Sequence, residues 1–155
     1  MTAFPTIRAF FDEPTNTISY LVADPTTKRA AIIDPVLDYD HASGKGSTKS
    51  ADIILDEAEA LGLTIDWVLE THAHADHVSG APYIKLKTGA KVGIGEHIRE
   101  VQKIFRPVFN AIDVKGDGSE FDHLFKDGER FELGNIEAAV LHVPGHTPAD
   151  IAYRI

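Results

Sequence analysis

The chain contains no cysteine among its 155 residues. Disulfides, cysteine-ligated zinc and an internal thiol nucleophile are therefore excluded, so any sulfur chemistry must act on a sulfur atom of a substrate. The chain also lacks any apolar run close to the roughly 20 residues that span a bilayer. Residues 1–8 have no apolar core of the kind found in signal peptides. We therefore expect a cytoplasmic protein.

Positive charge is scarce as well. The sequence has 15 Lys and Arg against 24 Asp and Glu, which gives a formal net charge of -9. Such a field repels phosphate backbones and anionic bilayers, so we expect neither a nucleic-acid partner nor a membrane partner. The content of 43% hydrophobic and 25% charged residues is typical of a folded globular protein. Eight histidines are unusual in an acidic chain without cysteine, and they point to metal.

The first part of the chain predicts an antiparallel meander followed by alternating strands and helices, all in one domain. Turn residues separate short runs that are rich in apolar and β-branched residues. We expect strands at 7–11, 17–23, 29–34, 65–71 and 91–94. We expect helices at 50–61, 78–87 and 96–105, and a surface loop at 39–50.

The last part of the chain predicts an irregular segment and a hairpin. Residues 108–122 are rich in Gly and Asp, and residues 131–133 and 136–143 read as two strands that turn at Gly134-Asn135. A loop at 144–148 precedes a final strand at 151–155. Together the elements predict an α/β fold of mixed sheets covered by helices.

The segment 71–77, with the sequence THAHADH, follows directly on the predicted strand 65–71. The period of a strand places His72 and His74 on the same side of the chain. The next turn can bring Asp76 and His77 toward the same space. Neutral imidazole suits Zn, Fe, Ni and Cu, and the carboxylate adds charge. We interpret these four residues as metal ligands rather than as an exposed histidine cluster.

A second segment carries His146 in the sequence HVPGHTP at 142–148. Two prolines and a glycine after a predicted strand make a rigid loop, and a metal ligand needs such support. We predict that His146 is a ligand and that His142, within the strand, either supports the ligands from behind or is a packed residue. The isolated His41, His97 and His123 are interpreted as ordinary surface or packed residues.

These two segments together resemble the metallo-β-lactamase superfamily, and the resemblance covers essentially the whole chain. It implies an αββα sandwich with mixed sheets, in which residues 1–155 form the N-terminal portion and the start of an incomplete second half. The THAHADH form, the long loop after Asp34-Pro35 and the sequence GHTPAD are similar to the persulfide dioxygenase branch. The glyoxalase II thioesterases are the nearest relatives with different chemistry.

The resemblance implies two alternative ligand sets. In persulfide dioxygenases His72 and His146 would hold a single Fe(2+) together with an Asp in a Gly-Asp pair beyond residue 155, and His74, Asp76 and His77 would surround the site. In the two-zinc hydrolases His72, His74 and His146 would hold one Zn(2+), and Asp76 and His77 the other. Asp150, four residues after His146, is not a ligand position in the resemblance.

Three hypotheses follow. The first is an iron-dependent dioxygenase that oxidises a small persulfide, such as glutathione persulfide, to sulfite with O2. The second is a zinc-dependent thioester hydrolase in which Asp76 is catalytic, because it orients the attacking water or binds the second metal. The third is a truncated, inactive metal-binding module. The strand edge at 151–155 would favour a homo-oligomer.

Overall fold

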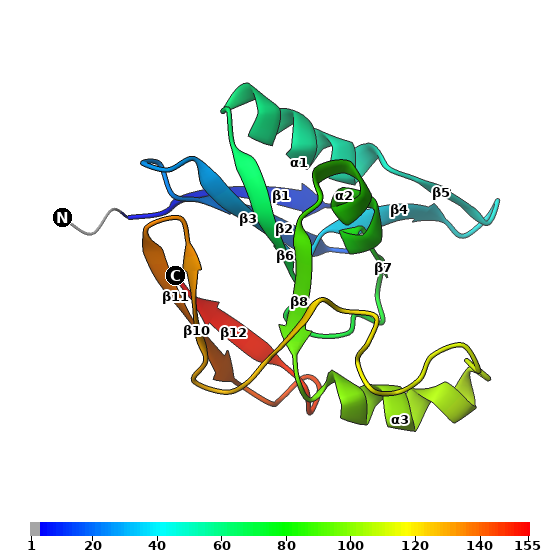
Figure 1. Cartoon of the computed structure of the whole chain (residues 1–155). Helices are drawn as coiled ribbons and strands as arrows, with labels where there is room; N and C mark the ends of the chain where they lie inside the picture. The colour runs from blue at the N-terminus through cyan, green and yellow to red at the C-terminus, as the bar shows by residue number, and fades with distance from the viewer. Residues whose placement is uncertain (1–3) are drawn as a thin grey trace.

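The structure is a computed structural model that describes residues 4–155 (Figure 1). Residues 1–3 belong to the segment in which we found no signal-peptide core, and they lie outside the described residues. The main sheet has six strands in the order β1-β2-β3-β6-β8-β9. Its strands are β1 (Thr6–Asp12), β2 (Thr17–Ala23), β3 (Arg29–Ile33), β6 (Thr64–Leu69), β8 (Lys91–Gly95) and β9 (His123–Phe125).

The pairing within this sheet changes from antiparallel to parallel, as the alternation in the sequence predicts. β1, β2 and β3 form the expected antiparallel meander, whereas β3, β6, β8 and β9 run parallel. A second, antiparallel sheet has the order β10-β11-β12. It consists of β10 (Arg130–Leu133), β11 (Ile136–His142) and β12 (Ile151–Arg154).

The helices and the second sheet cover opposite faces of the main sheet (Figure 1). α1 (Lys49–Ala60) and α2 (Ala81–Thr88) pack on one face, and α3 (Ile98–Val108) lies beyond one end of the strands. The layers are therefore helix, sheet and sheet. The helices of residues 4–155 leave the outer face of the second sheet uncovered, so the second half of the expected sandwich is incomplete here.

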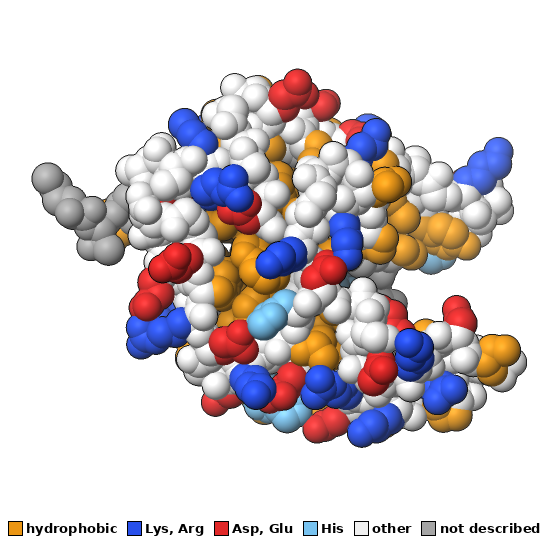
Figure 2. Space-filling model, viewed as in Figure 1, with side chains coloured by type: hydrophobic (Ala, Val, Ile, Leu, Met, Phe, Trp, Pro, Cys, Tyr) orange, Lys and Arg blue, Asp and Glu red, His pale blue; other side chains and the backbone are white. Residues whose placement is uncertain are grey.

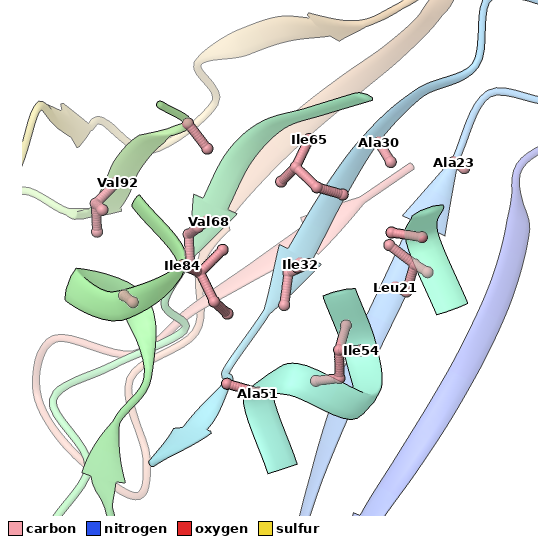
Figure 3. Packing of buried hydrophobic residues seen from close by; sticks show 13 residues of the cluster. Leu21, Ala23, Ala30, Ile32, Ala51, Ile54, Ile65, Val68, Ile84 and Val92 are labelled. Atoms are coloured by element: carbon pink, nitrogen blue, oxygen red, sulfur yellow. The ribbon is translucent and has the colours of Figure 1, made fainter. Parts of the chain in front are cut away.

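Two cores hold these layers together. The buried side chains of the core under the helices are aliphatic, and Figure 3 shows Ala51 and Ile54 of α1 among them. Ala58 lies on the same face of α1, because the spacing of the three residues places them on one side of the helix. The core between the sheets contains Leu69, Phe125 and other buried side chains, with the half-buried Trp67, Phe131 and Tyr153 packed against it. β6 supplies residues to both cores, which explains why its sequence is largely apolar.

The structure corrects two of the expected elements and adds a strand that was not expected. Residues 39–50 are not one loop, because β4 (Val36–Asp40) and β5 (Lys45–Ser47) pair as a hairpin. The helix expected at 78–87 begins only at Ala81, since β7 (Val78–Ser79) pairs with β4 and makes the sheet β5-β4-β7. β9 follows the irregular segment and was not expected; it adds a parallel edge strand to β8.

The helices formed by residues 4–155 are all too short, or too polar, to cross a bilayer.

Candidate metal centre

The centre lies where β3 and β6 end side by side. Because the two strands are parallel, their carboxyl ends meet at one edge of the sheet, and Asp34 follows β3 as the motif follows β6. The Thr71 amide donates a hydrogen bond to Asp34 Oδ1 at 2.8 Å, and the Thr71 hydroxyl donates one to Oδ2 at 2.8 Å. Asp34 has a φ of 49°, a left-handed backbone that aspartate tolerates better than most residues. This carboxylate therefore fixes the start of the motif.

His74 is the most firmly held imidazole of the motif. Its Nε2 lies 3.0 Å from Asp34 Oδ1 and 3.4 Å from Glu70 Oε2, and its side chain is 7% exposed. Burial acts to lower the pKa of His74, but the hydrogen bond to Asp34 and the nearby charges of Asp34 and Glu70 outweigh it and raise the pKa to about 10. Burial raises the pKa of Glu70 to about 7. With a pKa of about 10, the His74 ring is protonated on both nitrogens at neutral pH. A metal ion at Nδ1 would displace the proton there, while Nε2 keeps its own proton toward the carboxylates.

Threonine hydroxyls determine which nitrogen of the two neighbouring imidazoles carries a proton. The Thr71 hydroxyl donates to Asp34, so it can only accept from His72 Nδ1, which lies 2.9 Å away. In the same way Thr17 donates to Asp76 Oδ2 at 3.2 Å and accepts from His77 Nδ1 at 3.3 Å. Both Nε2 atoms therefore present a lone pair.

These two Nε2 atoms, of His72 and His77, are buried and have no hydrogen-bond partner among the described residues. Burial lowers the pKa of both histidines, which keeps their rings neutral. A buried polar atom without a partner costs roughly 1–3 kcal/mol, so native proteins seldom leave one without a reason. A metal ion needs deprotonated nitrogen donors of this kind. The residues present therefore fit a metal ion.

The loop with His146 reaches the same place from the second sheet. Its shape is set by Asp150, whose carboxylate accepts hydrogen bonds from the Thr147 amide at 2.8 Å and from the Thr147 hydroxyl. The His142 ring donates from Nε2 to the Pro148 carbonyl at 2.9 Å, across the loop. As a result His146 stands with its ring centroid 5.0 Å from that of His72.

The structure thus brings together all five residues that the sequence predicted as ligands. The ring centroids of His72 and His74 are 4.0 Å apart, and those of His74 and His77 are 4.3 Å apart. Asp76 Oδ1 lies 3.5 Å from His77 Nδ1 and 3.8 Å from His74 Nδ1. His146 completes the group from the other segment. Their roles as ligands remain predictions, whereas their convergence is a fact of the structure.

The histidines interpreted as ordinary have ordinary partners. His97 pairs with Glu100 at 3.0 Å, and His123 pairs with Glu129 at 2.6 Å. His142 is a packed residue, with its ring stacked on that of His97. Asp150 accepts hydrogen bonds on both carboxylate oxygens from Thr147 and therefore serves the loop.

Sequence reasoning missed the carboxylates behind the motif. Asp34 was noted only as part of Asp34-Pro35, and Glu70 was treated as part of a strand. The available signal was a charged residue at the end of each of two largely apolar strands, because a carboxylate is rarely buried without a partner. Glu70 is 3% exposed, and Ser79 donates a hydrogen bond to its Oε1.

Comparison with known proteins places this geometry in a family. The model of the metallo-beta-lactamase superfamily matches residues 12–155. The chain belongs to the metallo-beta-lactamase superfamily. The expected α/β fold of that superfamily, with mixed sheets, is thereby confirmed.

Individual members of the superfamily are similar over nearly the whole chain. A beta-lactamase hydrolase-like protein of Xylella fastidiosa is 50% identical over 151 residues, which are 97% of this chain and 35% of that protein. A hydroxyacylglutathione hydrolase of Rhodospirillum rubrum is 33% identical over 137 residues, 86% of this chain and 41% of that protein. The crystal structure of ETHE1 from Myxococcus xanthus matches with a TM-score of 0.72 at 27% identity, over 96% of this chain and 53% of that one. This superfamily chain thus spans about a third to a half of the length of these proteins.

Two hollows reach the centre of this superfamily member from different sides. A cavity of about 360 Å³ is lined by His72, His74 and His77 together with residues of α2 and β8. A wider groove of about 1010 Å³ runs from Asp76 and His77 along the β4–β5 hairpin. The space-filling view shows the molecule notched between that hairpin and α3 (Figure 2). A ligand held at the centre can therefore be approached from both sides.

Proposed function

We propose that this chain is the metal-binding part of an iron-dependent persulfide dioxygenase. The longer protein would oxidise a small persulfide, such as glutathione persulfide, with O2. In the balanced reaction one persulfide, one O2 and one water give one thiol, one sulfite and two protons. Both atoms of O2 go to the terminal sulfur, which is oxidised as O2 is reduced, and the sulfur–sulfur bond is then broken by water.

The observation that carries this proposal is the meeting of His72 and His146. Their ring centroids are 5.0 Å apart although the residues lie in different segments, and His72 Nε2 is buried without a partner. These are the two histidines that the resemblance to persulfide dioxygenases assigns to iron. The likeness to the ETHE1 structure, at 27% identity over 96% of the chain, supports the same branch. A carboxylate from outside residues 1–155 would complete the ligand set.

Fe(2+), when bound, would supply the relay of electrons between the persulfide sulfur and O2. The residues of this chain have other tasks. His72 and His146 hold the ion, while Asp34 and Thr71 fix the orientation of the rings behind it. The groove along the β4–β5 hairpin would admit the body of the persulfide, because it opens at Asp76 and His77.

A second function, zinc-dependent hydrolysis of a thioester, is favoured by one feature. Donor atoms of His74, Asp76 and His77 all lie within 4.8 Å of one another, so they could hold a second metal ion. In that case Asp76 would bind this ion or orient the water that attacks the carbonyl carbon. The 33% identity with a hydroxyacylglutathione hydrolase supports this alternative.

The experiment that separates the two uses the full-length protein that contains this chain, loaded with iron. Oxygen uptake is measured with an oxygen electrode in the presence of glutathione persulfide, beside an assay of glutathione thioester hydrolysis. We expect oxygen uptake with sulfite release, and we expect the matched variant His72→Ala to show neither. Hydrolysis without oxygen uptake by the iron-loaded protein would overturn the dioxygenase proposal in favour of the hydrolase.

A further inference from the structure

The cavity of about 360 Å³ beside the centre differs chemically from the groove on the other side. Apart from the centre itself, its wall is formed mainly by apolar side chains of α2, β8 and the segment before β9, with Lys85 and Glu120 as its charged members. The apolar members are Ala73, Ala81, Pro82, Val92, Ile94 and Phe121. Ala81, Val92 and Ile94 are nearly fully buried, so this wall belongs to the rigid core. The cavity ends at the three imidazoles of the motif.

The groove, in contrast, carries many polar groups beside apolar side chains such as Leu37 and Val78. The β4–β5 hairpin contributes hydroxyl and carboxylate side chains together with Lys45. His77 lines both the groove and the cavity, so the two hollows meet at the centre. A centre with one polar approach and one apolar approach is suited to two reactants of different polarity.

The polar atoms at the inner end of the cavity are mostly engaged. The Ser79 hydroxyl donates to Glu70 Oε1 and accepts from the Ala81 amide at 3.0 Å. Of the buried atoms there without a partner, the Nε2 atoms of His72 and His77 would face the metal ion. This leaves Glu70 Oε2, which lies 3.4 Å from His74 Nε2. A water molecule needs two to four polar partners, and apolar cavities that cannot supply them stay dry. Dioxygen has no such requirement, because it is small, uncharged and apolar.

We propose that this cavity, bounded by Ala81, Val92 and Ile94, is the site through which dioxygen reaches the centre, while the persulfide enters by the groove. This inference rests on the proposed dioxygenase function and adds to it a separate binding site for the second substrate. Because the two reactants would arrive from different sides, filling the cavity should affect one of them alone.

A substitution that fills the cavity tests the proposal in the full-length, iron-loaded protein. Ala81 is 3% exposed at the start of α2, and Ala81→Leu would place its added carbons in the cavity. We expect the KM for O2 to rise about tenfold and the KM for glutathione persulfide to stay within about twofold. The matched control is Ala60→Leu, the same change at an exposed position at the end of α1, which should alter neither constant.

Xenon binding to the unsubstituted protein gives a readout that does not depend on activity or on the folding of a variant. Xenon occupies apolar cavities, so crystals of the iron-loaded protein under xenon pressure should show a xenon atom beside Ala81 and Val92. A cavity without xenon, or an unchanged KM for O2 in Ala81→Leu, would show that the cavity is not the dioxygen site. Oxygen uptake by the unsubstituted protein would in that case still support the dioxygenase proposal. Absence of that uptake would overturn both, and an Ala81→Leu protein that lost only thioester hydrolysis would identify the cavity as an acyl site.

Discussion

Two aspartates flank β3, the buried Asp24 before it and the half-buried Asp34 after it, and their hydrogen-bond partners differ. Asp24, in the turn before the strand, accepts four hydrogen bonds: from the amide and hydroxyl of Thr26, from the Thr27 hydroxyl and from the Asn135 amide. Asp34, directly after the strand, accepts from Thr71 and from the His74 ring. The first cluster joins the main sheet to the β10–β11 turn, and the second supports the metal centre.

The two ends of β3 differ in whether the buried polar atoms around them have hydrogen-bond partners. Three buried side-chain atoms of residues 4–155 lack a hydrogen-bond partner, and all three lie around Asp34. They are Glu70 Oε2, His72 Nε2 and His77 Nε2. Around Asp24 every carboxylate oxygen is paired. A fully satisfied polar cluster contributes to stability, whereas unpartnered buried donors and acceptors mark a place that is built for a ligand. The polar groups before β3 thus stabilise the fold, whereas those after β3 are arranged for a ligand.

The largest effect is expected from removing an imidazole at the functional end. His72→Ala and His146→Ala should each abolish stoichiometric metal binding in the full-length protein, because each removes one nitrogen donor from the centre. Metal content, measured by mass spectrometry of the purified proteins, gives the result. His123→Ala removes a histidine that pairs with Glu129, and it should retain the metal. Full metal content in either ligand variant would remove that residue from the ligand set.

A smaller loss is expected from Asp34→Asn. Asparagine tolerates the positive φ of this position, but it weakens the support of His74 and Thr71. We expect metal affinity to fall about 10- to 100-fold, as is usual when a group behind a metal-binding histidine is changed. Metal competition titrations measure the affinity. Asp66→Asn, which removes the carboxylate that pairs with Arg29 on the surface, is the control and should leave the affinity unchanged. An equal affinity in Asp34→Asn would contradict the role given to Asp34.

At the structural end, Gly134→Ala should lower stability without lowering the metal content of the folded protein. Gly134 has a φ of 62°, and an added Cβ would lie 2.0 Å from Thr27 Oγ1 and 2.6 Å from Asp24 Oδ2. We expect a loss of about 2–3 kcal/mol from strain and overpacking together. Gly128→Ala separates the two causes, since Gly128 has a φ of 74° but open space around it, and should cost about 1 kcal/mol. Thermal unfolding of the full-length variants measures both, and similar losses at the two sites would show that the contact with Asp24 is unimportant.

The sequence predicted what depends on neighbours in the chain. The period of the strands, the apolar face of α1 and the spacing of the histidines in 71–77 are local patterns, and the structure agrees with them. The hairpin of β4 and β5 is not predicted because β5 has only three exposed, polar or glycine residues. β7 is not predicted because its two residues form a strand only by pairing with β4. Local patterns carry no information about such partners.

The candidate site, like the fold, could be predicted from the sequence only in part. The convergence of 71–77 with His146 could be predicted from residue types and from the family resemblance. The carboxylate that anchors Thr71 and His74 could not, because Asp34 lies 37 residues before Thr71 and meets it only through the parallel pairing of β3 with β6. The bond of Asp24 with Asn135 spans 111 residues and depends on the packing of the two sheets.

The smallest expected effect concerns acid and Asp24. Hydrogen bonds, the first from Thr26, hold the pKa of Asp24 well below its usual range. A lowered pKa in the folded state contributes stability above the unfolded pKa of about 4, and this contribution is lost as the pH falls toward the folded pKa. Asp24→Asn lacks it at every pH. The difference in unfolding free energy between the original protein and the variant should therefore be largest near neutrality and should narrow below about pH 4. Urea unfolding of both proteins in the metal-free form measures this difference in unfolding free energy without a contribution from metal loss. A difference that stayed constant down to pH 2.5, about 1.5 units below the unfolded pKa, would show that the charge of Asp24 does not stabilise the junction between the sheets.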